Sequence, residues 1–355
     1  MKQDHERRSM PNLLRVDSSY VGDTTTVVTI CIRGKHFYPA SKAQARLKLL
    51  RRLLQELAKR RQWTAIDVVL LPGGYLRRKK PLLATSPKKR LRILRESRLG
   101  REVKTISHWL HEVCPGITLV CGIDTPPHSR QLGGDELVAA WRDGVLIGVA
   151  RKAFPASGDT DGKIPVYVVS LDDVDDPQRL ITLKNNRRAL LLGCYDAFGV
   201  RAVADVRYYH SSNIRWVFDA EGREQKSTAP IRDAHMRRWQ AFLKCHPPDL
   251  ALAAIHRFKA PGQDCYWQRH GIAGASSALQ GAAILGAAHF SHVLPDRITA
   301  SPLAAVDVPA SHLKQGPHRK AHPFNPIDGF TLQDGQGRDC ALIRLFVISH
   351  ERNIS

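Results

Sequence analysis

The sequence predicts a mixed α/β domain whose strands and helices pack in layers as a sandwich. Two observations carry this prediction. Short apolar or β-branched segments alternate with longer segments in which leucines recur at helical spacing. Two of the predicted strands also follow each other directly as a hairpin, which a uniformly alternating parallel sheet would not contain.

The first elements form a strand, helix, strand unit. Residues 24–33 (TTTVVTICIR) are β-branched and apolar, as is typical of a strand. Leucines recur at helical spacing over 43–61, and residues 66–71 form a short apolar strand that ends in Pro72-Gly73-Gly74. Residues 1–20 lack periodicity and are predicted to form an N-terminal tail.

The hairpin is the clearest local signal in the middle of the chain. Strands at 136–141 and 145–150 are joined by Arg142-Asp143-Gly144, and an Asp-Gly pair favours a tight antiparallel turn. Before the hairpin come a basic stretch at 77–101 and then a helix that contains Ile106 and Val113. The remaining strands before the chain's second half are predicted at 117–123, 166–170 and 188–193.

The second half begins with a polar insertion at 207–247, which contains six arginines and an amphipathic helix at 231–244. The regular pattern then resumes, with strands at 249–256, 282–290 and 341–348 and a helix at 264–279. We therefore expect one domain over 21–350 that carries a basic segment at 76–104 and the insertion at 207–247.

The net charge of +21 is the compositional outlier. Residues 42–104 hold twenty Lys or Arg and four acidic residues, so they contribute +16 of it. Clustered basic residues support non-specific binding to nucleic acid. However, much of the segment is the polar face of a helix, aromatic residues are few and no nucleic-acid-binding motif is present. A nucleic acid is therefore the less favoured partner, and the charge would equally guide an acidic substrate.

The expected location is the cytoplasm, without a membrane segment. Residues 1–16 are polar and charged, unlike a secretory signal, and apolar stretches such as 284–290 are too short to span a bilayer. The seven cysteines have no paired spacing that would indicate a disulfide framework. Because His312, His318 and His322 are poorly spaced for a metal, we predict neither a metal nor a cofactor.

Three strand ends carry reactive or flexible groups: Pro72-Gly73-Gly74, Arg151-Lys152 and Cys194-Tyr195-Asp196. Binding residues of α/β folds collect at strand ends. In this order the motifs resemble the nitrilase superfamily of carbon-nitrogen hydrolases. Its members carry a glutamate in a Pro-Glu motif, a lysine in an Arg-Lys motif after a hairpin strand, and the nucleophile in a Cys-Tyr-Asp-like motif. The resemblance covers roughly 26–202, and DGVLIGVARKAFPASGD is its most specific part.

The resemblance implies a four-layer α-β-β-α sandwich, commonly a homodimer, that hydrolyses a non-peptide C–N bond in a small amide or nitrile. Cys194 would be the nucleophile, and the Lys152 ammonium would favour the thiolate and stabilise the oxyanion. The backbone N–H of Tyr195 would assist it, and Asp196 would bond local backbone or a nearby arginine. Water would then hydrolyse a covalent acyl-enzyme.

The sequence departs from the family at the general base, since Gly73 stands where the glutamate is expected. His256 is the first candidate replacement, because it ends a strand predicted to neighbour that of Cys194 and a Cys-His pair activates a thiol. His289 ends a later strand and is a second candidate and a predicted substrate contact. Further candidates are His292, Asp135, Glu136, Asp159 and Asp161. The glycines 73 and 74 are also expected to leave space for a bulkier ligand or to expose N–H groups to an anion.

Two other interpretations are consistent with these motifs. A catalytically inactive protein of the same fold would bind a ligand or partner, including nucleic acid through the basic segment, and would not need the missing glutamate. A class I glutamine amidotransferase ranks lower. That family has glycines closely flanking its cysteine on both sides, whereas Cys194 is followed by Tyr-Asp-Ala-Phe.

Overall fold

The strands of the protein form one large sheet and one small one. The computed structural model describes residues 24–34, 42–60, 65–82, 86–126, 134–156, 169–170, 174–201, 214, 216–218, 224–258, 267–279, 282–290, 306–307, 322–323 and 327–350. The main sheet follows the order β6-β5-β4-β2-β1-β13-β12-β9-β8. The predicted tail at 1–20 lies outside the described residues.

The first half of the main sheet is built around β1. Its strands are β1 (Thr24–Arg33), β2 (Val68–Leu70), β3 (Leu76–Arg77), β4 (Thr118–Asp124), β5 (Glu136–Arg142) and β6 (Val145–Arg151). β17 (Asp339–Ser349) pairs antiparallel with β1 from Thr24↔Ser349 to Ile32↔Ala341, and β16 (Asp328–Gln333) pairs with β17. The N-terminal and C-terminal strands of the described chain are thus direct neighbours.

The second half of the sheet joins the first where β1 ends, because Ile32 and Arg33 pair with β13. Its strands are β8 (Leu180–Thr182), β9 (Arg188–Gly193), β12 (Leu250–Phe258) and β13 (Ala283–Phe290), with β14 (Val306–Asp307) and β15 (His322–Pro323) beside them. The small sheet consists of β7 (Val169–Ser170), β10 (Trp216–Phe218) and β11 (Glu224–Lys226).

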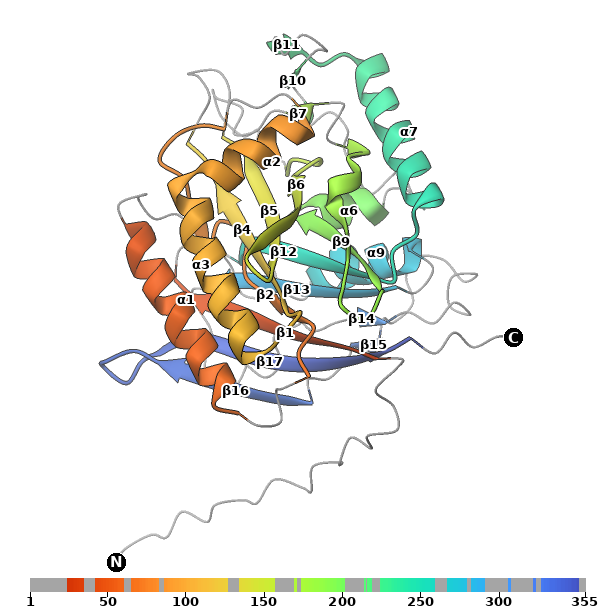
Figure 1. Cartoon of the computed structure of the whole chain (residues 1–355). Coiled ribbons are helices and arrows are strands. Elements are labelled where there is room, and N and C mark those ends of the chain that lie inside the picture. The colour runs from red at the N-terminus through yellow and green to blue at the C-terminus, as the bar shows by residue number, and fades with distance from the viewer. Residues whose placement is uncertain are drawn as a thin grey trace, which may run out of the picture.

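Helices lie on two opposite sides of the sheet (Figure 1). One side carries α1 (Ala43–Ala58), α2 (Pro87–Glu96) and α3 (Arg98–Val113). The other carries α6 (Asp196–Arg201), α7 (Ala229–Cys245) and α9 (Ala273–Ala278), with a π-helical turn, η7, at Trp267–Ile272. A 3₁₀ turn, η4, spans Pro177–Arg179.

Three buried clusters show that the helices and the two halves of the sheet stack as four layers. The first joins α1 and α3 to β1 and β4, and the second joins α6, α7 and α9 to β9 and β12. The third lies between the two halves and contains Val120 and Ala150 from one and Leu191 and Ala254 from the other. The predicted α-β-β-α sandwich is confirmed by these clusters.

The hairpin forms as predicted. Leu137 pairs with Arg151 in its register, and both turn residues have positive φ, 54° for Asp143 and 77° for Gly144. A tight turn of this hand needs such residues, because a Cβ is poorly tolerated there except on Asn or Asp. The hairpin fixes Glu136 opposite Lys152, whose N–H donates to the Glu136 carbonyl at 2.8 Å.

Several elements differ from the sequence-based expectation. The basic stretch contains a separate helix, α2, which begins at Pro87 after the N-cap Ser86, whose Oγ accepts from the Lys89 N–H at 3.3 Å. Where one helix was expected at 264–279, the described part is the π turn followed by α9. The insertion helix is longer than expected and forms α7. Within the described residues, no helix is long and apolar enough to cross a membrane.

Candidate active site

Five chemically active side chains gather at one end of the space between the two halves of the sheet. Asp124 ends β4, Glu136 begins β5 and Lys152 follows β6; Cys194 follows β9, and His256 lies near the end of β12. Side chains alternate along a strand, and for Asp124, Glu136, Lys152 and His256 a residue of the inter-sheet core lies two or four positions away. These four groups therefore share the space that this core fills further along the strands. Cys194 does not follow this alternation, because it lies in the turn after β9 and also packs against the cluster on the helix side.

Cys194 sits on a strained turn. Its φ of 41° is left-handed, which costs a residue other than glycine roughly 1–2 kcal/mol. The turn is held because the Cys194 N–H donates to the Ala254 carbonyl at 2.8 Å. A Cβ placed on Gly193 would lie 3.0 Å from the Lys152 Cβ, so this glycine lets β6 and β9 approach closely beside the thiol. Strain of this kind is common where a reactive group must be presented.

Lys152 is buried beside this turn and forms an ion pair with Glu136. Only 1% of its side chain is exposed, against 15% for Glu136, and the Nζ atom contacts Oε2 of that carboxylate. A buried ammonium requires such a partner, because desolvation of a lone charge is very costly. The pair places a fixed positive charge in the same space as the thiol.

The imidazole of His256 lies at the centre of the site. Its Nε2 is 2.9 Å from Asp124 Oδ1 and 3.7 Å from Glu136 Oε1. Burial by itself lowers the pKa of His256, but the charges of Glu136 and Asp124 and hydrogen bonds with Asp124 and Cys194 raise the pKa well above the usual value. These neighbours therefore favour the charged, imidazolium form of the ring beside Cys194.

The glycines after Pro72 are packed against this histidine. A Cβ on Gly73 would lie 2.8 Å from His256 Nδ1 and 2.8 Å from the Ala254 carbonyl oxygen, and the Gly73 N–H donates to Ile255 O at 3.0 Å. In this structure the space beside Gly73 that was expected to take a bulkier ligand is occupied, and the contact of Gly73 with a ligand or anion stays a prediction. The protein's own imidazole fills that space, and the N–H is already used.

Gly74 follows the same pattern. Its φ is 62°, and a Cβ there would lie 2.5 Å from Asp124 Oδ2 and 3.1 Å from His256 Cδ2. The space beside Gly74 is thus also occupied by side chains of this chain. Both glycines act by allowing the Asp124 and His256 pair to approach the backbone.

Asp196 fastens the strand ends on either side of the nucleophile. Its buried carboxylate accepts N–H groups from Gly193 at 3.0 Å, Ala153 at 2.7 Å and Phe154 at 2.9 Å, and Arg179 lies 3.5 Å away. Desolvation raises the pKa of Asp196 against the opposing effect of Arg179 and the three N–H groups. Asp196 does bond local backbone and an arginine, as the sequence predicted.

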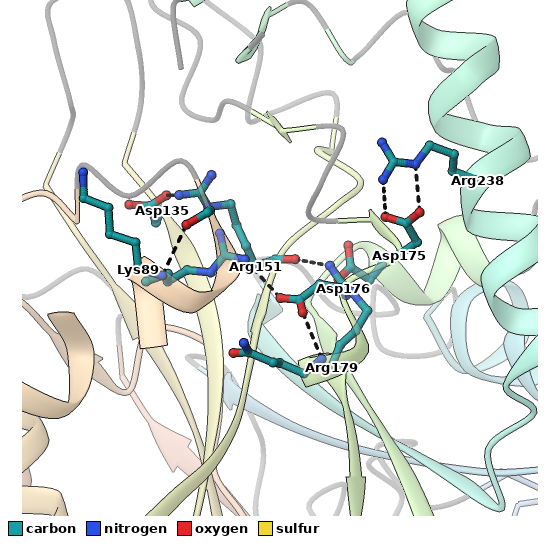
Figure 2. A network of polar contacts seen from close by, with 11 residues as sticks. Lys89, Asp135, Arg151, Asp175, Asp176, Arg179 and Arg238 are labelled. Carbon is teal, nitrogen blue, oxygen red and sulfur yellow. Dashed lines mark hydrogen bonds and ion pairs between the residues drawn. The ribbon is translucent and has the colours of Figure 1, made fainter. Parts of the chain in front are cut away.

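Further ion pairs lie near the Asp196 carboxylate (Figure 2), and they are buried except for the partly exposed pair of Arg238 with Asp175. Arg179 also donates to the carbonyl of Arg151, the residue before Lys152. The other pairs are Arg151 with Asp135 at 2.8 Å, Arg90 of α2 with Asp176 at 3.2 Å, and Arg238 of α7 with Asp175 at 2.6 Å. The end of β6 is therefore fixed from several directions, which limits movement of Lys152.

The remaining predicted residues have supporting positions. The Tyr195 ring stacks on Phe198 at 4.2 Å and meets Trp267 edge-on at 5.9 Å. His289 is fully buried, and its Nδ1 bonds the carbonyl of His256 at 3.0 Å. The substrate contacts predicted for Tyr195 and His289 stay predictions. In this structure His289 contacts the main chain of His256.

Of the other candidate bases, Asp135 is paired with Arg151 and Glu136 with Lys152. His292, Asp159 and Asp161 lie outside the described residues. Sequence reasoning missed Asp124, although a signal existed: it is the first charged residue after the apolar strand at 117–123. Across the described ranges, no group of three or more His, Cys, Asp or Glu could hold a metal ion.

Solved structures similar to this chain include amidases and a carbon-nitrogen hydrolase. An amidase from Nesterenkonia sp. shares 12% identity over 94% of each chain, with a TM-score of 0.44. A variant of the Nesterenkonia AN1 amidase, from the nitrilase superfamily, shares 14% over 92% of this chain and 91% of that chain (TM-score 0.43). A carbon-nitrogen hydrolase from Helicobacter pylori G27 shares 10% over 91% and 89% (TM-score 0.44). No family model and no curated protein matches the sequence.

Proposed function

We propose that the protein is a cysteine-dependent hydrolase that cleaves a non-peptide C–N bond of a small amide or nitrile. The observation that carries this proposal is the position of His256, whose imidazole lies against Gly73 and 2.9 Å from Asp124, with Cys194 among the groups that raise its pKa. A cysteine paired with a histidine has the nucleophile and the proton carrier that acyl transfer requires. Lys152 supplies a second positive charge in the same space.

The first half of the reaction forms a thioester. The thiolate of Cys194 attacks the carbonyl carbon of an amide, and the C–O π electrons move to oxygen, which the Lys152 ammonium stabilises. When the C–N bond breaks, the leaving nitrogen takes a proton from the His256 imidazolium. The products of this half are the amine and an acyl group bound to Cys194, with His256 neutral.

The second half releases the acid. Neutral His256 accepts a proton from water, whose oxygen attacks the thioester carbon. The C–S bond then breaks, the sulfur leaves as a thiolate, and His256 is again an imidazolium beside it. The net reaction consumes one water and one amide, and the site returns to its starting charge.

A binding protein without catalysis is the second candidate. It is favoured by the outer side of α2, where Lys88, Arg92 and Arg95 are exposed, so that a polyanion such as nucleic acid has a basic surface to contact. In that case Cys194 would be an ordinary thiol.

We also propose that the protein is a cytoplasmic homodimer. Light scattering would distinguish the dimer from a monomer.

The deciding experiment is mass-resolved alkylation with iodoacetamide at pH 7. Cys245 is exposed and is changed to Ser, so that it does not compete. Burial raises the pKa of the Cys114, Cys121 and Cys340 thiols, which should react slowly. We expect selective modification of Cys194 that is suppressed in Lys152→Ala and in His256→Ala. If Cys194 in the folded protein is alkylated no faster than an ordinary free thiol, the result would instead support a binding protein without catalysis.

A further inference from the structure

Asp124 is a charged residue of the site to which the proposed mechanism gives no role. Its side chain is 17% exposed, and its Oδ1 lies 2.9 Å from His256 Nε2. Its other oxygen, Oδ2, lies beside Gly74. A carboxylate buried to this extent needs a partner of opposite charge or a donor, and the imidazole is both.

Three glycines allow this pair to form. Gly73 and Gly74 carry no Cβ where the pair lies, and a Cβ on Gly122 would be 2.4 Å from the Gly73 Cα. The strand end at β4 and the turn after β2 therefore approach more closely than residues with side chains would permit. A side chain at position 73 and the observed position of His256 exclude each other. The position of the histidine therefore depends on the glycines.

Two carboxylates face His256, and they differ in geometry. Glu136, from β5, is 3.7 Å from Nε2 and is engaged by Lys152 of β6, whereas Asp124, from β4, is within hydrogen-bond distance of the same nitrogen. His289 of β13 bonds the carbonyl of His256 through its Nδ1. With Nε2 bonded to Asp124, Nδ1 is the ring nitrogen available to the thiol of Cys194.

We propose that Asp124 is a positioning residue that completes a Cys194–His256–Asp124 relay, assembled from three strand ends in place of a base at position 73. This inference rests on the proposed function. Asp124 holds the ring so that Nε2–H points to the carboxylate and Nδ1 points to sulfur. It also stabilises the imidazolium that forms when the thiol gives up its proton, which is the role of the orienting carboxylate in nucleophile–histidine–carboxylate triads.

The test is the pH dependence of Cys194 alkylation in wild type and in Asp124→Asn, both carrying Cys245→Ser. Asparagine keeps the shape and removes the charge, so the thiolate–imidazolium pair should give way to neutral thiol and imidazole. A neighbouring charge shifts a pKa by about one to three units, so we expect the rate at pH 7 to fall about tenfold or more. Above about pH 9.5 any accessible thiol ionises, and the rates should converge. A purely structural role would lower the rate at every pH.

Asp143→Asn is the matched control. Asp143 forms another aspartate–histidine pair, with His111 Nδ1 at 2.6 Å, in the hairpin turn away from the site. This variant should follow the wild-type profile within twofold. Unfolding midpoints of both variants should confirm that they are folded.

The outcomes separate the inference from the proposal beneath it. If His256→Ala slows Cys194 but Asp124→Asn retains the wild-type profile, the relay is wrong and the hydrolase proposal stands. A rate reduced equally at all pH values would also overturn the relay. If wild-type Cys194 itself reacts as an ordinary thiol, the proposed function fails first and the relay fails with it.

Discussion

Substituting Gly73 with alanine adds one methyl group at the point where the site is most crowded. The added Cβ would lie 2.8 Å from His256 Nδ1, where ordinary contact begins at 3.4 Å, so the two must separate by 0.6 Å (3.4 minus 2.8). The same Cβ would lie 2.8 Å from the Ala254 carbonyl, which cannot retreat freely because it accepts the N–H of Cys194. The imidazole is therefore the group that should move.

The expected effect is large on reactivity and moderate on stability. Overpacking of this kind costs about 1–3 kcal/mol. An ordinary cysteine thiol, with a pKa of about 8.5, is only about 3% thiolate at pH 7, so complete loss of the imidazolium contact would slow alkylation by up to about thirtyfold. Gly73→Ala should therefore resemble His256→Ala in its alkylation rate, although it removes no functional group.

The assay is the iodoacetamide rate at pH 7 together with the denaturant midpoint. Gly335→Ala is the control, because this hairpin glycine has no atom within 4 Å of an added Cβ. It should leave both quantities at their wild-type values. If Gly73→Ala also keeps the wild-type rate and midpoint, then His256 does not pack against Gly73 and the assembly of the site is wrong.

Three further predictions address other parts of the molecule. Asp196→Ala removes the carboxylate that three buried N–H groups and Arg179 share, so urea unfolding should show a loss of about 3–5 kcal/mol. Asp334→Ala should lower the midpoint much less, because the bonds of this carboxylate with Gln336 and Arg338 are exposed in the β16–β17 hairpin. Because the pKa of His256 is raised in the fold, its charged form should stabilise the protein fully below about pH 6.5 and progressively less as the pH rises through the folded pKa. The free energy of unfolding of the wild type, measured from pH 5.5 to 9, should therefore fall with rising pH. An equal fall in His256→Gln would contradict this prediction. Charge reversal at Lys88, Arg92 and Arg95 should weaken any salt-dependent binding of a single-stranded oligonucleotide, measured by fluorescence anisotropy, and leave the rate of Cys194 alkylation unchanged. A lower alkylation rate in the same variant would contradict the view that this surface and the thiol site are independent.

The sequence predicted the parts of the fold whose signals are local. The hairpin has both an Asp-Gly turn and two apolar strands, and the register follows from them. Helix α2 was missed because its charge dominates the pattern: only Arg90 and Leu94 are buried. The Ser86-Pro87 start would have identified it, since serine at the N-cap and proline at N1 are a recognised beginning of a helix.

The sequence predicts those residues of the site that lie at the ends of apolar strands. Cys194 and Lys152 each follow an apolar strand, His256 lies near the end of another, and the fold brings these strand ends together. The part that could not be predicted is the packing of the glycines against His256, because Pro-Gly-Gly read alone specifies a turn and gives no information on which side chain fills the space beside it. Asp124 depends on the same close approach, which only the three-dimensional arrangement reveals.

The pairing of β1 with β17 has a consequence for how the protein is made. β1 lies among the first described residues, yet one of its edges is covered by a strand at 339–349. During synthesis that edge must wait until residues 339–349 have emerged, and contacts so distant in sequence form slowly. An unpaired strand rich in threonine, valine and isoleucine is a template for pairing with other chains. Deletion of residues 339–349 should therefore cause aggregation of the nascent protein, because it leaves this edge of β1 unpaired.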